Sequence, residues 1–313
     1  MCGPCDPPSH DYSTQRHLLP GNHAVRPTPA GAGGSSELVI ERVELTYEGY
    51  TYKNSHIAYV PGRGPKPVVL IHPNYAGLKQ FDIDQAAFIA QCGYVGFALD
   101  LYKEVAEGET VADGPTGPTI ASVPYAFGDR NPARDRDTKQ GRENGRRHFA
   151  GAFEAMNGQL RNPKHWRGLM RTYLDAAFEH SAVESGKAAA IGYCFGGQCC
   201  LEQVRDGQPL QACVSFHGLL HSRPTRLDDP LNPMVRISPE EYETQIFEPS
   251  GCVNTYDTEC RVLIENGDLD GEVPQDSIDD WKAEMDEHGI DWRFNNVRQH
   301  YVDFPSAQGA ACA

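Results

Sequence analysis

The sequence is poor in basic residues, with 28 Lys and Arg against 43 Asp and Glu and a net charge of −15 at pH 7. Nucleic acids and anionic membrane surfaces bind proteins that present a basic surface. We therefore expect neither as a partner. The net charge does not exclude a small-molecule substrate, because a binding site can carry a local electrostatic field of its own.

Long apolar runs are also missing, since no stretch approaches the roughly 20 apolar residues that cross a bilayer. Residues 1–29 are polar and lack the basic and then apolar pattern of a secretion signal. We therefore expect an intracellular, cytoplasmic protein. In that compartment the ten cysteines are expected to be reduced thiols rather than disulfides.

The one CxxC pair, Cys2 and Cys5, opens the chain and has no predicted strand before it. A thioredoxin-like motif needs that strand, so we do not expect redox chemistry there. With His10 the pair offers an incomplete metal site, and no second well-spaced pair follows. Residues 1–36 are rich in Pro, Gly and Ser and predict a flexible arm before one domain over 37–313.

Apolar segments of strand length alternate with helical patterns over most of this domain. Residues 67–72 and 94–99 are continuously apolar, as in strands buried on both faces, and residues 81–92 between them have helical spacing. This β-α-β unit predicts an α/β fold with a mostly parallel central sheet and helices on both faces. Further strands are expected at 38–47, 50–60, 187–192, 211–216, 260–265 and 290–294.

Helices are expected at 138–161, 163–181 and 274–288, and a further one begins at the turn described next. A long loop over 103–136 precedes the first of them. Residues 219–257 contain five prolines and no periodic pattern. We interpret this segment as an insertion, a candidate lid over the site.

The most informative motif is Gly-Tyr-Cys-Phe-Gly-Gly at 192–197, between a predicted strand and a predicted helix. A strand, a tight turn with glycines and a helix form a nucleophile elbow, which here presents Cys194 instead of Ser. The helix N-terminus favours the thiolate. The alternative interpretation is a Gly-rich turn with a buried cysteine, but we favour Cys194 as the nucleophile.

An acid and a base follow in the order that this fold requires. Asp270 lies after strand 260–265 in an Asp-x-x-Val-Pro sequence, and we favour it over its neighbour Asp268 as the acid. His300 follows the last strand and is the expected base. Backbone N–H groups of Phe195 and Tyr75 are the expected oxyanion-hole donors.

Three other histidines lie near ends of predicted elements. His72 and His217 end strands and are expected to face the same pocket. His288 ends a helix and is expected at the surface.

The elbow at 192–197, Asp270 and His300, together with His-Pro-Asn-Tyr-Ala-Gly at 72–77, resemble the dienelactone hydrolase family of α/β hydrolases. The resemblance extends over roughly residues 38–305. The resemblance implies an α/β-hydrolase fold and a Cys194–His300–Asp270 triad that acts on a small ester or lactone. It also implies no metal and no organic cofactor, and we expect a monomer or a homodimer. Asn74 stands where family members carry a Glu tied to control of the thiol, so dienelactone itself is not the expected substrate.

Three alternatives stay open at this point. The chain could be a binding or regulatory protein on a hydrolase fold, or an acyl transferase or peptidase with the same triad. It could also be a thiol redox protein that uses Cys199 and Cys200, although adjacent cysteines in a helix point in different directions.

Overall fold

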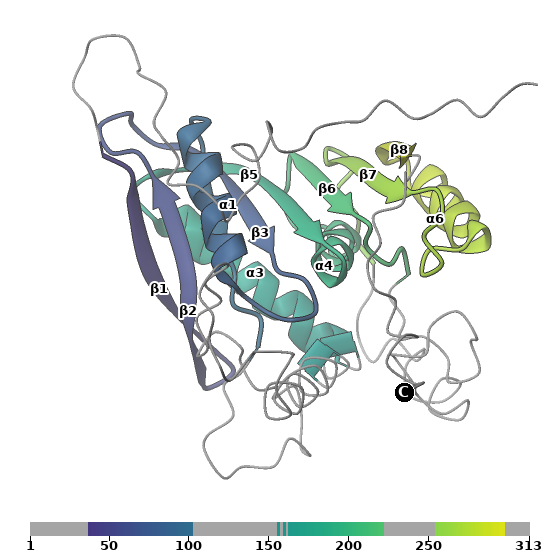
Figure 1. Ribbon diagram of the computed structural model, residues 1–313, viewed down its shortest axis with the longest axis horizontal. Helices are drawn as coiled ribbons and strands as arrows, with labels where there is room; N and C mark the ends of the chain where they lie inside the picture. The colour runs from purple at the N-terminus through teal and green to yellow at the C-terminus, as the bar shows by residue number, and fades with distance from the viewer. Residues whose placement is uncertain (1–36, 103–154, 157–158, 161, 222–253, 298–313) are drawn as a thin grey trace, which may run out of the picture.

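The computed structural model describes residues 37–102, 155–156, 159–160, 162–221 and 254–297. Its centre is an eight-stranded sheet in the order β1-β2-β4-β3-β5-β6-β7-β8 (Figure 1). The pairs β1–β2 and β2–β4 are antiparallel, and all the other pairs are parallel. The predicted α/β class with a mostly parallel sheet is confirmed.

The helices and strands predicted for the described residues are present. The strands are β1 Val39–Tyr47, β2 Tyr50–Tyr59, β3 Lys66–His72, β4 Val95–Ala98, β5 Val183–Tyr193, β6 Ala212–Phe216, β7 Arg261–Gly267 and β8 Asp291–Val297. The helices are α1 Gln80–Gln91, α3 Pro163–Glu179, α4 Phe195–Arg205 and α6 Gln275–Glu287. Strand β5 begins earlier than its apolar run, in the more polar residues 183–187.

Helices cover both faces of the sheet (Figure 1). Helix α1 lies on one face against β2, β3 and β4, whereas α3 and α4 lie on the other and contact each other. Strand β3 is therefore enclosed on both sides, which explains why Val68, Leu70 and Ile71 are fully buried.

Two apolar clusters result from this layering. The larger one fills the face of α3, α4 and α6 and includes Trp166, Phe195 and Trp281. The smaller one lies under α1 and includes Ile71 and Ala86. These clusters hold α1 and α4 firmly on opposite faces of β3 and β5, so that the loop after β3 and the turn after β5 meet at one edge of the sheet.

Several predictions fall outside the described residues. The arm over 1–36, the loop over 103–136, most of the helix predicted at 138–161, most of the candidate lid and His300 belong to this group. Of the helix at 138–161, residues 155–156 and 159–160 are described and are helical. Within the described part of the chain, no helix is both long and apolar enough to cross a membrane.

Candidate active site

The turn between β5 and α4 places Cys194 directly before the first residue of the helix. Its backbone has φ 56° and ψ −122°, a conformation that residues with a side chain rarely adopt. A Cβ on Gly192 would lie 2.0 Å from the carbonyl oxygen of Gly196, and a Cβ on Gly196 would lie 2.2 Å from that of His72. The glycines of the motif are therefore required by the close approach of α4 to β3 and β5.

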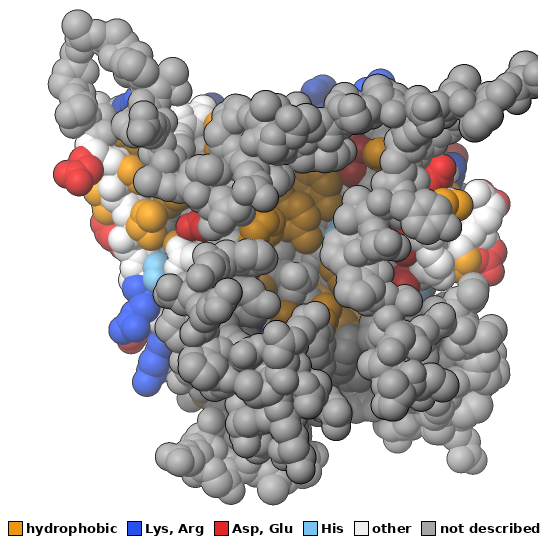
Figure 2. All heavy atoms as spheres, viewed as in Figure 1, with side chains coloured by type: hydrophobic (Ala, Val, Ile, Leu, Met, Phe, Trp, Pro, Cys, Tyr) orange, Lys and Arg blue, Asp and Glu red, His pale blue; other side chains and the backbone are white. Residues whose placement is uncertain are grey.

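Main-chain hydrogen bonds hold this turn on both sides. The N–H of Cys194 donates to the carbonyl oxygen of Phe216 at the end of β6, at 3.0 Å. The carbonyl oxygen of Cys194 accepts from the N–H of Gly197 at 2.9 Å, which starts the helix. The thiol thus lies at the carboxyl ends of the parallel strands, where ligands bind in open α/β sheets. Apolar side chains gather in the middle of the face seen in Figure 2, where β5 and β6 lie in Figure 1.

The surroundings of the thiol disfavour its ionisation. Removal from water raises the pKa of Cys194 to about 11, and the charges of Glu272 and Asp270 also raise it. Hydrogen bonds from the N–H groups of Phe195 and Tyr75 act in the opposite direction but do not compensate. The N–H of Phe195 at the helix start lowers the pKa of the thiol, in the direction expected, but burial and the two carboxylates outweigh it.

The two N–H groups that reach the sulfur come from separate elements. Phe195 is the first residue of α4, and Tyr75 lies in the loop after β3. That loop is a tight turn in which the carbonyl oxygen of Asn74 accepts from the N–H of Gly77 at 2.9 Å. The side-chain oxygen of Asn74 also accepts from the N–H of Ala76 at 2.8 Å. The structure thus brings the two expected oxyanion donors to one atom.

The two candidate acids lie in different settings in the loop after β7. Asp270 is half-buried, and its charge acts on both Cys194 and His217. Asp268 is exposed, and its N–H donates to the carbonyl oxygen of Val297 at 3.0 Å. Of the two, Asp270 is the carboxylate whose charge raises the pKa of the thiol.

Glu272 is the residue near the thiol that sequence reasoning missed. Its N–H donates to Oδ1 of Asp270 at 3.0 Å, and its charge raises the pKa of Cys194 more than that of Asp270 does. Burial and the neighbouring Asp270 raise the pKa of Glu272 itself. The sequence feature that could have identified Glu272 was its position two residues after Asp270, in the same loop.

The other histidines differ from one another. His72 does not face the site, contrary to expectation: it is fully buried, and its Nε2 lies 2.7 Å from Oε1 of Gln203 in α4. Burial lowers its pKa to about 4, so it is a neutral core residue. Loss of water lowers the pKa of His217 below its usual value, and the charge of Asp270 acts in the opposite direction. His288 is exposed, as expected.

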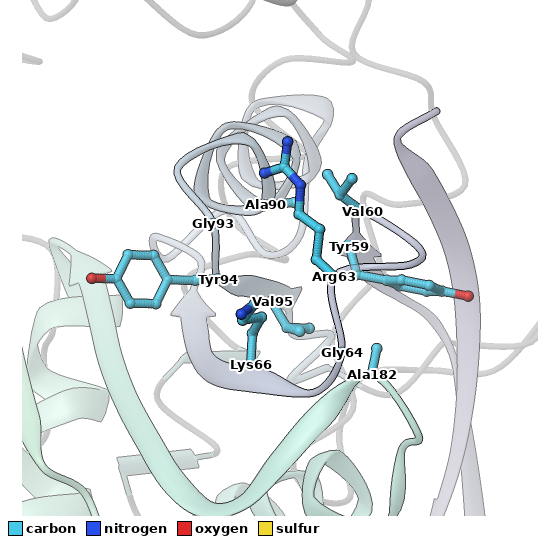
Figure 3. Close-up of a pocket in the computed structure, with 10 residues that line it drawn as sticks. All are labelled: Tyr59, Val60, Arg63, Gly64, Lys66, Ala90, Gly93, Tyr94, Val95 and Ala182. Atoms are coloured by element: carbon cyan, nitrogen blue, oxygen red, sulfur yellow. The ribbon is translucent and has the colours of Figure 1, made fainter. Parts of the chain in front are cut away.

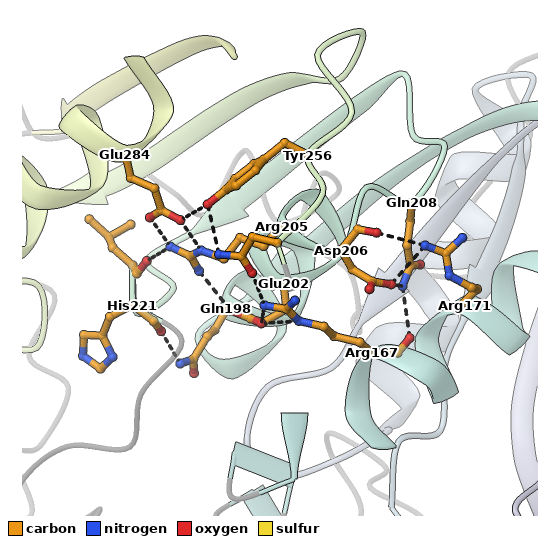
Figure 4. A network of polar contacts seen from close by, with 12 residues as sticks. Arg167, Arg171, Gln198, Glu202, Arg205, Asp206, Gln208, His221, Tyr256 and Glu284 are labelled. Carbon is orange, nitrogen blue, oxygen red and sulfur yellow. Dashed lines mark hydrogen bonds and ion pairs between the residues drawn. The ribbon is translucent and has the colours of Figure 1, made fainter. Parts of the chain in front are cut away.

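The far end of α4 carries buried charges instead of a thiol (Figure 4). Glu202 is fully buried between Arg167 of α3, at 2.8 Å, and Arg205, at 3.0 Å. Arg205 also donates to both carboxylate oxygens of Glu284 in α6, each at 2.7 Å. A third group on Arg205, the carbonyl oxygen of Leu220, accepts at 2.6 Å. These contacts tie α3, α4 and α6 together.

A hollow in the described residues lies where β3 and β4 begin, at the opposite end of these strands from Cys194 (Figure 3). Its lining includes Lys66 and Val95, which begin β3 and β4, and Ala182, which precedes β5. None of the candidate catalytic residues lines it. Among the described residues, no group of three or more His, Cys, Asp or Glu side chains is arranged to hold a metal ion.

Comparison with known families matches the description "Dienelactone hydrolase family" over residues 55–297. The chain belongs to the dienelactone hydrolase family. It is accordingly an α/β-hydrolase enzyme of the ester-hydrolase type, as the resemblance of its motifs implied. The matched region contains the elbow, both N–H donors and the loop of Asp270 and Glu272.

Solved structures show the same fold at low sequence identity. One named m3DLH is 23% identical, with a TM-score of 0.54, and the match covers 83% of this chain and 81% of that one. Dipeptidyl peptidase 4 of Porphyromonas gingivalis is 11% identical, with a TM-score of 0.54 over 83% of this chain and 32% of its own. No curated protein sequence matches this dienelactone hydrolase family member.

Proposed function

We propose that this family member cleaves a small carboxylic ester or lactone by covalent catalysis, with Cys194 as nucleophile, His300 as base and Asp270 as the acid that orients it. One observation carries the proposal. The sulfur of Cys194, on a strained turn, receives hydrogen bonds from the N–H groups of both Phe195 and Tyr75. Two donors that converge from separate elements are what an oxyanion hole needs.

In the proposed first step, His300 takes the proton of the thiol, and the sulfur attacks the carbonyl carbon of the substrate. The N–H groups of Phe195 and Tyr75 stabilise the negative oxygen of the tetrahedral intermediate. The C–O bond then breaks, and the alcohol leaves with the proton from His300. This leaves a thioester on Cys194, which water hydrolyses with His300 again as base.

The pKa of Cys194 explains why a base is needed. With a pKa of about 11, roughly one thiol in 10,000 is ionised at pH 7. A base that removes the proton during the attack avoids that low population. Asp270 is favoured over Asp268 as the acid because its charge acts on Cys194 and on His217, which marks it as part of the same group of side chains.

The test is turnover of a panel of short-chain p-nitrophenyl esters and simple lactones by the wild type and by Cys194→Ala. We expect kcat to fall by at least about 1,000-fold in the variant. Cys213→Ala is the matched control, because Cys213 is also a buried free thiol but lies within β6. Mass spectrometry of the enzyme quenched during turnover should show one added acyl group on Cys194. Full turnover by Cys194→Ala would rule the mechanism out.

The acid is tested by a second pair of variants. Asp270→Asn should lower kcat by about 100- to 10,000-fold, because the imidazole then loses its orienting charge. Asp268→Asn should stay within about threefold of the wild type, since that carboxylate is exposed. The reverse result would assign the role to Asp268.

A further inference from the structure

A buried tyrosine contacts both of the elements that supply the N–H groups at the Cys194 sulfur. Tyr102 lies shortly after β4, and 1% of its surface is exposed. Its hydroxyl donates to the carbonyl oxygen of Tyr75 at 2.9 Å. Its ring stacks on that of Phe195, with ring centroids 6.3 Å apart and an interplanar angle of 21°.

The contact with the loop after β3 involves the ring as well as the hydroxyl. A Cβ on Gly77 would lie 2.9 Å from Cδ2 of Tyr102, so the ring is packed against the last residue of the tight turn. The turn is closed from within by Asn74. Tyr102 therefore supports from outside the segment whose N–H reaches the thiol.

The contact with α4 continues into the core. The ring of Phe195 stacks on that of Trp166 as well as on that of Tyr102, and the centroids of Phe195 and Trp166 are 5.3 Å apart at 14°. Trp166 belongs to α3 and is fully buried. The first residue of α4 is thus held by two ring contacts, one of them with Tyr102.

We propose that Tyr102 is a positioning residue, which sets the spacing between the N–H groups of Tyr75 and Phe195 so that both point at one oxygen in the transition state. This inference rests on the proposed function. The hydroxyl restrains Tyr75 through its carbonyl oxygen, and the ring restrains Phe195. A single side chain thereby couples a loop and a helix that have no covalent link nearby.

The test is Tyr102→Phe, which keeps the ring and removes only the hydroxyl. We expect kcat on a p-nitrophenyl ester to fall by about 10- to 100-fold, with KM within about threefold, because oxyanion donors act on the transition state. The inhibition constant of a trifluoromethyl ketone, which forms an oxyanion on the thiol, should rise by a similar factor.

The matched control is Tyr173→Phe. Tyr173 is equally buried, and its hydroxyl donates to the carbonyl oxygen of Asp100 at 2.6 Å, away from the thiol. The Tyr173 hydroxyl also accepts from Oγ of Ser55 at 2.9 Å, so Tyr173→Phe loses two buried hydrogen bonds and its melting temperature should fall at least as much as that of Tyr102→Phe. Only Tyr102→Phe should lose kcat.

The outcomes are distinguishable. A wild-type enzyme that turns over no ester would refute the proposed function. If the wild type is active, unchanged kcat in Tyr102→Phe, or an equal loss in Tyr173→Phe, would refute the role of Tyr102. If Tyr102→Phe does not fold, Phe195→Leu tests the other contact: a loss of kcat with unchanged KM is expected, and unchanged kcat overturns the proposal.

Discussion

The two ends of helix α4 are built on different chemistry. At its start, the Cys194 thiol is uncharged, its pKa is raised to about 11, and two N–H groups reach its sulfur. At its end, Glu202 and Arg205 form a buried ion pair, and both oxygens of Glu202 accept from the guanidinium groups of Arg167 and Arg205. The start directs donors at an atom that can react, whereas the carboxylate at the end has its oxygens occupied by cations.

This difference separates activity from stability along one helix. Arginine–carboxylate pairs in the interior are costly to break, because the partner that remains is a buried charge without compensation. Removal of a thiol with a raised pKa changes the free energy of unfolding little, but it would end the proposed chemistry. Three substitutions test whether the division holds, in order of expected effect on free energy.

The largest effect is expected from Glu202→Ala at the end of α4. Arg167 would then be buried without its carboxylate partner, while Arg205 would keep only Glu284, so the free energy of unfolding should fall by about 3–5 kcal/mol. Urea unfolding followed by circular dichroism measures this change. The folded fraction at low temperature should keep its kcat.

The control for this prediction is Glu287→Ala. Glu287 is exposed at the end of α6, so its loss should change the free energy of unfolding by less than about 0.5 kcal/mol. A Glu202→Ala protein as stable as the control would mean that the buried charges do not hold the helices together.

An intermediate effect is expected from Gly196→Ala near the start of α4. The new Cβ would lie 2.2 Å from the carbonyl oxygen of His72 and 2.7 Å from that of Pro73. Because neither backbone atom can move away alone, α4 and the loop after β3 must separate. We expect a loss of about 2–3 kcal/mol in unfolding free energy, with a fall in kcat because the N–H groups of Tyr75 and Phe195 move apart.

Gly271→Ala is the stability control, since its added Cβ would meet nothing within 4 Å. Thermal unfolding of the two variants gives the comparison. If Gly196→Ala has the same melting temperature as Gly271→Ala, the close contact between α4 and β3 does not constrain the turn.

The smallest effect on free energy is expected from Glu272→Gln, which should change reactivity and leave stability almost unchanged. The charge of Glu272 raises the pKa of Cys194, so its removal lowers that pKa and increases the thiolate fraction. At pH 8, alkylation of Cys194 by iodoacetamide should become about 3- to 10-fold faster.

The pH dependence gives a check on the same thiol. The pKa of about 11 lies above the working range, so the alkylation rate of the wild type should rise roughly tenfold per pH unit between pH 8 and 10. In Glu272→Gln the profile should move to lower pH. A rate that is already level at pH 8 would mean that the thiol is ionised there.

Most of the fold could be predicted from the sequence because its strands are short apolar runs with polar boundaries. The runs at 67–72 and 211–216 match β3 and β6 closely, and the glycines of the elbow identified the turn. Cys194, Asp270 and Tyr75 were named because chain order on this fold relates loops that lie far apart in sequence. The role of Asp270 stays a prediction, and His300 lies outside the described residues.

The misses have a common physical cause, because the surroundings of a side chain depend on elements that lie far away in the sequence. Glu202 and Arg205 have the composition of a solvent-facing surface, yet α3 and α6 cover them. His72 was expected at the site because it ends a strand, but its side chain lies on the α4 face of the sheet. To place Glu272 near the thiol, the path of its loop must be known, and the sequence does not supply that path.

The backbone at Cys194 has a consequence for how this enzyme can lose its activity. At φ 56° a side chain is strained by about 1–3 kcal/mol, and glycine is not. Cys194→Gly should therefore melt at a higher temperature than Cys194→Ala, the reverse of the usual order for these two residues. A lineage or an expression screen that selects only for soluble, long-lived protein would retain such a variant, and only selection on turnover would keep a thiol at this position.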